Sequence, residues 1–347
     1  MPLIRRKGQE CMMKNENPIL SVENLTVQFC TKKGTAKVLN GLSFHLKQGE
    51  KLGLVGESGV GKSVAAWACL NIIKPPGECV AGKVLYQGEN LLEKSEQDLI
   101  SLRGNEISLT VPRAHSQLNP LLTIGDQLMN SYIAHAGLPR REAKKKAYMA
   151  ALDILDKVGI PDPKNRMKAY PNELSGGMAQ RVVIALALIN NPTVLIADDP
   201  TGGLDVTIQA QIIELLNEMV TELGTTALII THHLGLVAQH CDHVAIMYAG
   251  QIVESCPTET LFAAACHPYS KSMLSSVRDT GEQWGEEYIL PGRPPSPMEL
   301  PTGCYLNPRC PHATELCRTK EPPYVNIGES HIVKCHFAKK GGAAYDG

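Results

Sequence analysis

The 347-residue sequence predicts an α/β protein built on a mostly parallel sheet, and three observations carry that prediction. A short apolar strand at residues 51–55 runs into a glycine-rich loop and then into a helix over 64–73. Further along the chain, apolar strands alternate with amphipathic helices, which is typical of a parallel sheet covered by helices. A helix-rich stretch at about 98–191 interrupts this alternation, and a proline-rich segment at 286–347 ends the chain.

The glycine-rich loop GESGVGKS matches the phosphate-binding pattern G-x-x-x-x-G-K-[ST]. Its backbone amides would turn inward around a polyphosphate, and the following helix adds the positive end of its dipole. In this pattern Lys62 reaches the outer phosphates and Ser63 helps to hold Mg²⁺. An ordinary glycine-rich turn would not require Lys and Ser at these two places. We therefore predict that a nucleoside triphosphate binds to Gly56, Glu57, Ser58, Gly59, Val60, Gly61, Lys62 and Ser63.

Composition sets the frame for this site. The length suggests two or three units, and 34 basic against 35 acidic residues give no sign of nucleic-acid binding. No apolar run reaches the ~18–20 residues of a membrane helix. Eleven cysteines without an export signal argue for a reducing compartment rather than a disulfide framework. Residues 1–18 are expected to be a flexible tail, with Met12 or Met13 as an alternative start.

Two later strands are predicted in the same sheet. Residues 193–197 (TVLIA) form a buried strand that runs into Asp198, and residues 225–231 (TTALIIT) form another that ends at His232. An acidic residue at a strand end can hold Mg²⁺ through its water shell, although Asp198 alone is a weak signal. The helix between the strands covers 206–223, where apolar residues recur at helical spacing before a glycine stop: Ile208, Ile212, Leu215, Leu216, Met219 and Gly224.

The stretch at about 98–191 is predicted to be a helical insertion in the α/β core, because it has few strand signals. One of its helices is expected over 140–158. The basic residues of that helix are interpreted as a solvated face rather than a binding patch: Arg140, Arg141, Lys144, Lys145 and Lys146.

A second anion-receiving element lies in the string ELSGGMAQR, which opens a helix over 178–189. Ser175, Gly176 and Gly177 at the start of that helix would form a nest of backbone amides. Two phosphate-binding loops in one chain suggest a shared site. One loop would hold this chain's nucleotide, and the other would close over the nucleotide of a partner.

These motifs, in this order, resemble the ATP-binding subunits of ABC transporters over roughly residues 20–265. The narrower similarity is to the dipeptide/oligopeptide permease ATPases, a branch that includes nickel and opine importers. The first resemblance rests on the phosphate loop, the LSGGM signature, Asp198, the Leu204–Asp205 loop and His232. The second rests on Leu118-Asn119-Pro120, the ELSGGM-x-QR string, Asp205-Val206-Thr207 and the His267–Lys271 segment.

The resemblance implies a transport-coupled ATPase that uses ATP and Mg²⁺, in a nucleotide-binding domain over 19–285. It implies a head-to-tail pair with a second ABC ATPase subunit, on the cytoplasmic face of the cell membrane. Two membrane-spanning permease subunits and an extracytoplasmic substrate-binding protein would complete an importer of di- and oligopeptides. Nickel chelates or opine-type solutes are the alternative substrates, because other subunits choose the substrate. No nucleic-acid partner is expected.

The resemblance also assigns roles to single residues. Asp199 and His232 would be catalytic, with Ser63 and Asp198 at Mg²⁺. Phe29 stands where the family places an aromatic ring on adenine, although a strand-core role is equally consistent with the sequence. The signature would contact the partner's nucleotide, together with the following loop: Leu174, Ser175, Gly176, Gly177, Met178 and Asp205.

Four departures from the family pattern affect this chain's own site. Asp199 stands where the family has Glu, and because aspartate is one methylene shorter its carboxylate is drawn back by over ~1 Å. Such a misplacement can cost on the order of 100-fold in rate. Pro112 stands where the family has a Gln that touches Mg²⁺, and proline has no side-chain donor or acceptor. The others are Gly202-Gly203, where bulkier small residues are common, and His233, where the family often has Asp.

Because the signature is intact, these departures suggest an asymmetric heterodimer. The chain would bind ATP at a slow or inactive site and complete an active site on its partner. Two alternatives stay open: Asp199 supports normal hydrolysis, or the chain is a regulatory subunit that never hydrolyses ATP. A membrane-free ABC ATPase is disfavoured, because a second cassette and a long coiled coil are both missing.

The segment 286–347 is predicted to be a small four-cysteine lobe. Nine prolines between Pro291 and Pro323 rule out a long helix or a central strand. Four thiols in this segment could hold an iron–sulfur cluster or, less readily without a C-x-x-C pair, Zn²⁺. Unlinked cysteines are the other reading. The resemblance favours a 4Fe–4S cluster, since several peptide-permease ATPases carry this tail, with the ligands Cys304, Cys310, Cys317 and Cys335.

Overall fold

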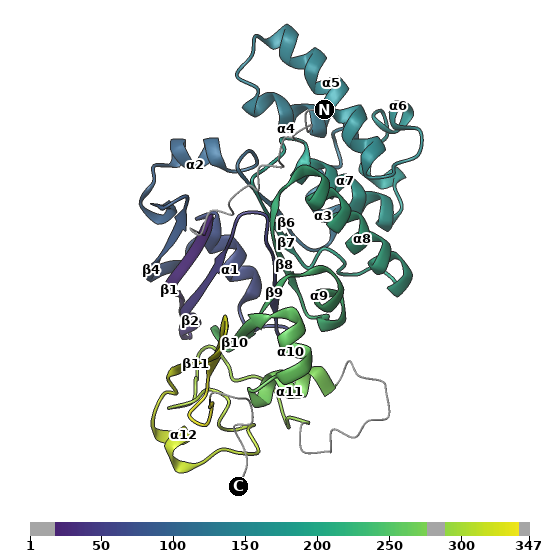
Figure 1. The fold of residues 1–347 in the computed structure, drawn as a ribbon. Coiled ribbons are helices and arrows are strands. Elements are labelled where there is room, and N and C mark those ends of the chain that lie inside the picture. Colours follow the sequence, from purple (N-terminus) through teal and green to yellow (C-terminus); the bar gives the residue numbers. More distant parts are fainter. Residues whose placement is uncertain (1–17, 276–288, 340–347) are drawn as a thin grey trace, which may run out of the picture.

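The computed structural model describes residues 18–275 and 289–339. Figure 1 shows the order of the elements along the chain. The strands are β1 (Leu20–Thr31), β2 (Gly34–Leu46), β3 (Lys51–Val55), β4 (Gly77–Tyr86), β5 (Glu89–Asn90), β6 (Ile107–Thr110), β7 (Val194–Asp198), β8 (Thr226–Thr231), β9 (His243–Tyr248), β10 (Gln251–Pro257), β11 (Tyr324–Gly328) and β12 (His331–Lys334).

The helices are α1 (Lys62–Cys69), α2 (Glu96–Leu102), α3 (Ala114–Gln117), α4 (Ile124–His135), α5 (Arg140–Lys157), α6 (Pro163–Arg166), α7 (Gly176–Leu188), α8 (Val206–Leu223), α9 (Leu234–His240), α10 (Thr258–Ala264), α11 (Pro268–Ser275) and α12 (Glu315–Thr319). Two short 3₁₀ turns are η1 (Leu91–Glu93) and η2 (Pro171–Glu173).

The main sheet has the strand order β11-β12-β10-β9-β3-β8-β7-β6. The five strands from β9 to β6 are mutually parallel, which confirms the predicted α/β class, and β10, β12 and β11 add antiparallel pairs at one edge. A second, antiparallel sheet has the order β2-β1-β4-β5. It lies beside α1 on one side of the main sheet (Figure 1).

The two faces of the parallel strands bury different cores, because successive side chains of a strand point to opposite faces. Along β7, Val194 and Ile196 join the core formed with α1 and the antiparallel sheet. Leu195 and Ala197 join the core formed with α8 and with the helices of the 98–191 stretch, including α7. The same alternation holds in β8 and β9. Strands buried on both faces explain the near-continuous apolar runs in the sequence.

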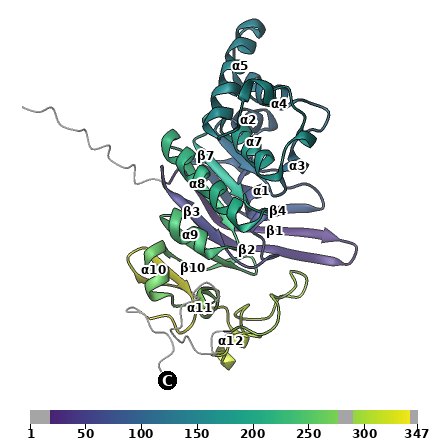
Figure 2. The same ribbon diagram turned by 90° about the vertical axis from the view of Figure 1, so that its right-hand side faces the viewer.

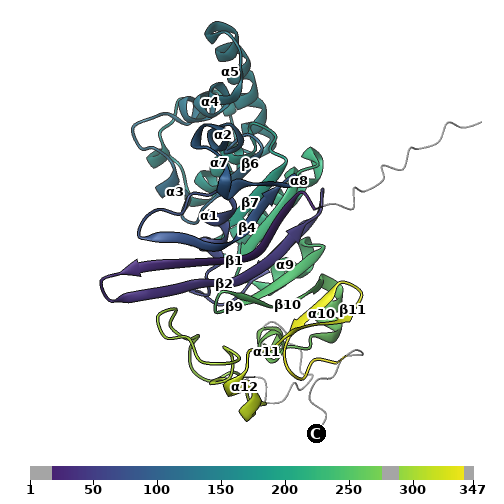
Figure 3. The same cartoon turned by 90° about the vertical axis from the view of Figure 1, so that its left-hand side faces the viewer.

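The helical region and the C-terminal segment lie at opposite ends of the molecule. Helices α4 and α5 stand beyond one end of the sheets, and α12 lies beyond the other (Figures 2 and 3). The basic residues of α5 are all exposed, as the solvated-face interpretation requires: Arg140, Arg141, Lys144, Lys145 and Lys146. Within the described ranges, no helix is both long enough and apolar enough to cross a bilayer.

Two sequence expectations need correction. The stretch 98–191 also holds β6, an edge strand of the main sheet, which at four residues is too short to stand out by pattern. Helix α1 begins at Lys62 and ends at Cys69 instead of covering 64–73, because Asn71 adopts a left-handed backbone with φ 50°. Helix α8 begins and ends as predicted, with Gly224 in the left-handed cap. The predicted tail at 1–18 lies, apart from Pro18, outside the described residues, as do Met12, Met13 and the boundary at 285/286.

Candidate nucleotide site

The predicted site residues meet at the carboxyl ends of three adjacent parallel strands. The phosphate loop follows β3, Asp198 ends β7, and His232 follows β8. The strands are in register, with Val55 opposite Thr231 and Asp198 opposite Ile230. Ligands bind in this position in open parallel sheets, because the loops after the strands form a crevice there.

Two positions of the phosphate loop require glycine, one because of a close contact and the other because of its backbone conformation. A Cβ on Gly56 would lie 2.3 Å from the carbonyl oxygen of Met247, and Gly61 has φ 108°. Lys62 Nζ donates hydrogen bonds to the carbonyls of Gly56 at 2.7 Å and Glu57 at 2.9 Å. Burial lowers the pKa of the Lys62 amine, against the raising effect of Asp198, Asp199 and Glu57. The ammonium is thus held inside the loop, where outer phosphates would replace the carbonyls.

The loop and the strand ends enclose a cavity of about 280 Å³. It is lined by Val38, Ser58, Gly59, Gly61, Lys62, Ser63, Val64, Pro112, Asp198, Asp199, Thr231 and His232. The sequence motifs predicted most of these residues. Val38, Val64 and Thr231 were not predicted as site residues, because a valine or a strand threonine next to a phosphate site carries no distinguishing signal.

Two carboxylate oxygens in this cavity fit a cation. Asp198 Oδ2 and Asp199 Oδ1 are buried, and neither has a hydrogen-bond partner. Burial is the main factor that raises the pKa of Asp198, and the Asp199 charge adds to it, whereas Ser63 and Lys62 lower it. Mg²⁺ prefers carboxylate, hydroxyl and phosphate oxygens, so Ser63 and Asp198 are suited to hold it beside a nucleotide. The ion would neutralise phosphate charge, and these residues would orient it.

Asp199 lies close to His232 but does not hydrogen-bond it. The distance from Asp199 Oδ1 to His232 Nδ1 is 3.7 Å. Asp199 has a left-handed backbone with φ 44°, which aspartate tolerates better than most residues. A Cβ on Gly202 would lie 2.6 Å from Asp199 Oδ2. Two of the sequence departures are therefore linked, because the glycine leaves room for this aspartate.

Pro112 lines the nucleotide cavity, whereas Gln117 does not. The Gln117 side chain folds back on Val111, where it donates to the carbonyl and accepts from the amide. The side-chain amide of Gln117 therefore does not take the place of the glutamine that the family pattern has at position 112.

The signature lies away from this chain's own cavity, since residues 174–178 do not line it. Ser175 caps α7 by accepting a hydrogen bond from the Met178 amide at 3.4 Å. Ser175 and Gly176 are exposed, while Leu174 is buried. Asp205 caps α8 by accepting from the Ile208 amide at 3.1 Å and does not line the cavity either. An exposed helix start is open to a phosphate carried by another chain.

Phe29 is half-buried in β1 and lies over Gly77, where a Cβ would be 2.6 Å from its Cε1. It packs against the core of the antiparallel sheet and does not line the nucleotide cavity.

The four predicted cluster ligands come together around one small cavity at the C-terminal end of the molecule. Its lining includes His267, His312 and His336 beside the thiols of Cys304, Cys310, Cys317 and Cys335. Gly303 permits the close loop crossing, because a Cβ there would lie 2.3 Å from the Cys317 carbonyl oxygen. Burial raises the pKa of the Cys304 thiol to about 11 and that of the Cys310 thiol to about 12.

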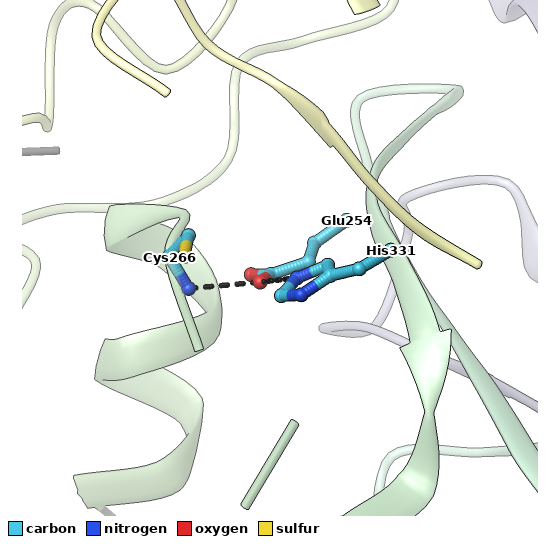
Figure 4. Close-up of side chains that lie close together, drawn as sticks. All are labelled: Glu254, Cys266 and His331. Carbon is cyan, nitrogen blue, oxygen red and sulfur yellow. Dashed lines mark hydrogen bonds and ion pairs between the residues drawn. The ribbon is translucent and has the colours of Figure 1, made fainter. Parts of the chain in front are cut away.

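A second cluster of possible ligands was not predicted from the sequence. Among the described residues, only Glu254, Cys266 and His331 have three ligand atoms within 4.8 Å of one another (Figure 4). Glu254 is fully buried and accepts from the Cys266 amide at 2.8 Å and the His267 amide at 3.0 Å; His331 Nε2 lies 2.8 Å from it. Burial would raise the pKa of Glu254, but its hydrogen bonds lower it overall. With its oxygens occupied, the carboxylate joins β10 to β12 rather than offering a metal site.

The chain combines an α/β fold with a phosphate loop and an acidic residue at a strand end that can hold a cation. It also has a second, exposed group of backbone amides at a helix start. Together these features define a nucleotide-binding cassette. Two family profiles match the chain. The one described as ABC transporter matches residues 39–202, and the one described as oligopeptide/dipeptide transporter, C-terminal region, matches residues 253–317. The chain belongs to the ABC transporter ATPases, in the family of dipeptide and oligopeptide transport ATP-binding proteins.

Relatives match nearly the whole chain. The dipeptide transport ATP-binding protein DppD of Escherichia coli is 40% identical over 319 residues, covering 92% of this chain and 96% of that protein. The oligopeptide transport ATP-binding protein OppD of Salmonella typhimurium is 42% identical over 306 residues, covering 88% and 90%. The oligopeptide transport ATP-binding protein AppD of Bacillus subtilis is 38% identical over 326 residues, covering 94% and 98%.

Solved structures agree with the fold. The bacterial ABC transporter cassette MJ0796, solved as a dimer, has a TM-score of 0.60 and 26% identity, covering 69% of this chain and 98% of that one. CbiO1 of Clostridium perfringens, part of the ABC transporter complex cbiONQ, has a TM-score of 0.59 and 29% identity, covering 72% and 92%.

Proposed function

We propose that this chain is the ATP-binding subunit of an importer for di- and oligopeptides, with two permease subunits and an extracytoplasmic binding protein. The phosphate loop, with Lys62 turned inward, is the observation that carries ATP binding. The C-terminal profile at 253–317 and the peptide-transport relatives support the substrate class. Nickel chelates and opine-type solutes remain the alternatives for the same machinery.

Reconstitution in vesicles tests the substrate class. The full chain, its partner ATPase, the permease subunits and the binding protein are assembled, and uptake of a labelled dipeptide is compared with a labelled nickel–histidine chelate and an opine. We expect the vesicles to accumulate the dipeptide in the presence of ATP. An unlabelled pentapeptide should inhibit this accumulation. Accumulation of the chelate or the opine alone would contradict the peptide assignment.

The chain's own catalytic site is proposed to be the slow one of a heterodimer. Three features support this proposal: Asp199 is one methylene short, Pro112 offers no donor or acceptor to the cavity, and Gln117 is held by the Val111 backbone. Ser175 caps an exposed helix start, which supports a role for it at a partner's nucleotide. Turnover would therefore occur mainly at the site made by this chain's signature and the partner's phosphate loop.

The four-cysteine cavity is proposed to hold a 4Fe–4S cluster. The thiols line one cavity, yet no three of them lie within 4.8 Å of one another. A tetrahedral zinc site with Zn–S bonds of about 2.3 Å would bring its sulfur atoms to roughly 3.8 Å from one another. The wider spacing supports a larger group than one ion. Because other redox centres are not indicated, the cluster would stabilise or regulate the lobe.

Metal analysis tests this assignment. Full-length chain purified without oxygen is expected to contain about four iron and four sulfide per chain, with broad absorbance that dithionite bleaches. Cys310→Ser should remove both, while Cys79→Ser, a matched half-buried cysteine outside the lobe, should not. One zinc per chain, or no metal in anaerobic protein, would overturn the cluster proposal.

A further inference from the structure

Every polar group of Glu57, the second residue of the phosphate loop, is held by another part of the chain. Its carbonyl accepts from Lys62 Nζ at 2.9 Å. Its amide donates to the hydroxyl of Tyr269, in α11, at 2.8 Å. Its carboxylate accepts from the guanidinium of Arg309, 252 positions later in the chain, at 3.2 and 3.4 Å. Glu57 therefore connects the phosphate-binding lysine to the C-terminal part of the molecule.

Arg309 lies in the four-cysteine lobe, directly before Cys310, which lines the cysteine cavity. The residue is 8% exposed, and its Nε donates to the carbonyl of Pro291 at 2.9 Å. The guanidinium also lies 5.7 Å from the ring centroid of Tyr248, which packs against Tyr269 at 4.7 Å between centroids. Arg309 is buried and hydrogen-bonded to Pro291 of the lobe. A movement of the phosphate loop that keeps the Glu57–Arg309 contact would therefore move the lobe as well.

The lobe is fixed to the main sheet on its other side. Strand β12 pairs with β10. Buried Glu254 contacts His331 of β12 and accepts from the Cys266 amide (Figure 4). It also accepts from the His267 amide. His267 lines the cysteine cavity. The lobe is therefore held at two places, at the phosphate loop through Arg309 and at the sheet edge through Glu254 and His331.

The Glu57 carboxylate lies on the loop that receives a highly charged anion. Paired with Arg309, its charge is neutralised and its side chain is turned toward the lobe. Unpaired, it would repel the nucleotide and compete for the Lys62 ammonium. A charge-assisted, two-pronged contact of this type is stronger than a neutral hydrogen bond and fixes geometry as well.

We propose that Arg309 and Tyr269 are positioning residues of the nucleotide site, through which the four-cysteine lobe sets the affinity of the phosphate loop for nucleotide. The effect of cluster loading on affinity rests on the proposed 4Fe–4S function, whereas the effect of Arg309 does not. By linkage, whatever the lobe does to nucleotide binding, bound nucleotide does in reverse to the lobe.

The test measures Mg–ATP affinity of the full chain by fluorescence of a labelled analogue, with thermal unfolding as the folding check. Arg309→Gln is expected to weaken binding on the order of 10-fold. Arg318→Gln, at an exposed lobe arginine that pairs with Glu315, is the matched control and should change affinity by less than about twofold. Tyr269→Phe should weaken binding as well, because it leaves the Glu57 amide without its acceptor.

Rescue separates positioning from general stability. Adding Glu57→Gln to Arg309→Gln removes the unpaired carboxylate and should restore affinity to within about threefold of wild type. If Arg309→Gln lowers the unfolding temperature but leaves affinity unchanged, or if the double variant binds as weakly as the single one, the proposal is overturned. Should Arg309→Gln not fold, Arg309→Lys keeps the charge but loses the two-pronged contact, and it is expected to weaken binding by a smaller factor, about threefold.

A second arm separates the proposal from the cluster assignment. Emptying the cysteine site with a chelator under oxidising conditions, followed by removal of the chelator before Mg–ATP is added, should weaken Mg–ATP binding in wild type but not in Arg309→Gln. If the chain carries no metal, the cluster assignment fails while the Arg309 comparison stands. If the emptied and loaded chains bind Mg–ATP equally, loading of the cysteine site does not set the affinity; that part of the proposal is refuted, and the variant comparison alone decides the role of Arg309.

Discussion

Replacing Ser175 by alanine is expected to lower ATP turnover of the assembled transporter about 100-fold, whereas Asp199→Ala should leave it within about twofold. Ser175 stands at the exposed start of α7. In the proposed heterodimer, its hydroxyl and the following amides would face the terminal phosphate of a partner's nucleotide. Removing one preorganised donor from a developing charge typically has an effect of this size. Asp199, in contrast, belongs to a cavity that Pro112 leaves without the family's glutamine.

The measurement is steady-state phosphate release by the full complex in vesicles, with wild-type partner subunits and equal assembly checked for each variant. Ser116→Ala, at an exposed hydroxyl outside the signature, is the control. Asp199→Glu combined with Pro112→Gln should raise turnover, because it lengthens the carboxylate side chain by one methylene and supplies an amide to the cavity. Loss of turnover in Asp199→Ala would show that Asp199 is a working catalytic carboxylate and would end the asymmetric interpretation.

Lys62→Ala is expected to weaken Mg–ATP binding to the isolated chain on the order of 100-fold. The ammonium is partly buried at the loop and donates to two carbonyls. With nucleotide present, those donors would go to phosphate oxygens, and two hydrogen bonds to charged groups contribute about 3 kcal/mol together. That free energy corresponds to roughly 100-fold in the dissociation constant.

Titration of a fluorescent ATP analogue checks this expectation. Lys94→Ala is the control. Lys94 pairs with Glu89 and lies well beyond the phosphate loop in the sequence, so its loss should leave the affinity for the analogue unchanged. Lys62→Arg tests geometry, since its larger planar head does not fit between the Gly56 and Glu57 carbonyls. Unchanged affinity in Lys62→Ala would mean that the loop does not bind the outer phosphates.

Sequence patterns determined the elements whose signals are local. The phosphate loop, the strand into Asp198 and helix α8 with its Gly224 cap depend on short-range backbone geometry and spacing, so each was predictable in place. Pattern also identified the four cysteines as a group, because no other part of the chain combines thiols with so many prolines. The edge strand β6 was hidden, since four residues carry too little periodicity.

Only the tertiary structure decided how distant parts meet. The fit of Asp199 over Gly202 needs the turn's actual geometry, and the diversion of Gln117 depends on which backbone groups lie near it. The Arg309–Glu57 contact joins positions 252 residues apart, and no spacing rule relates them. Residue type and local spacing therefore named the chemistry of this protein, whereas packing of the sheet edge and the lobe set which charges face one another. Charge interactions depend on distance in space and on burial, and a linear pattern contains neither.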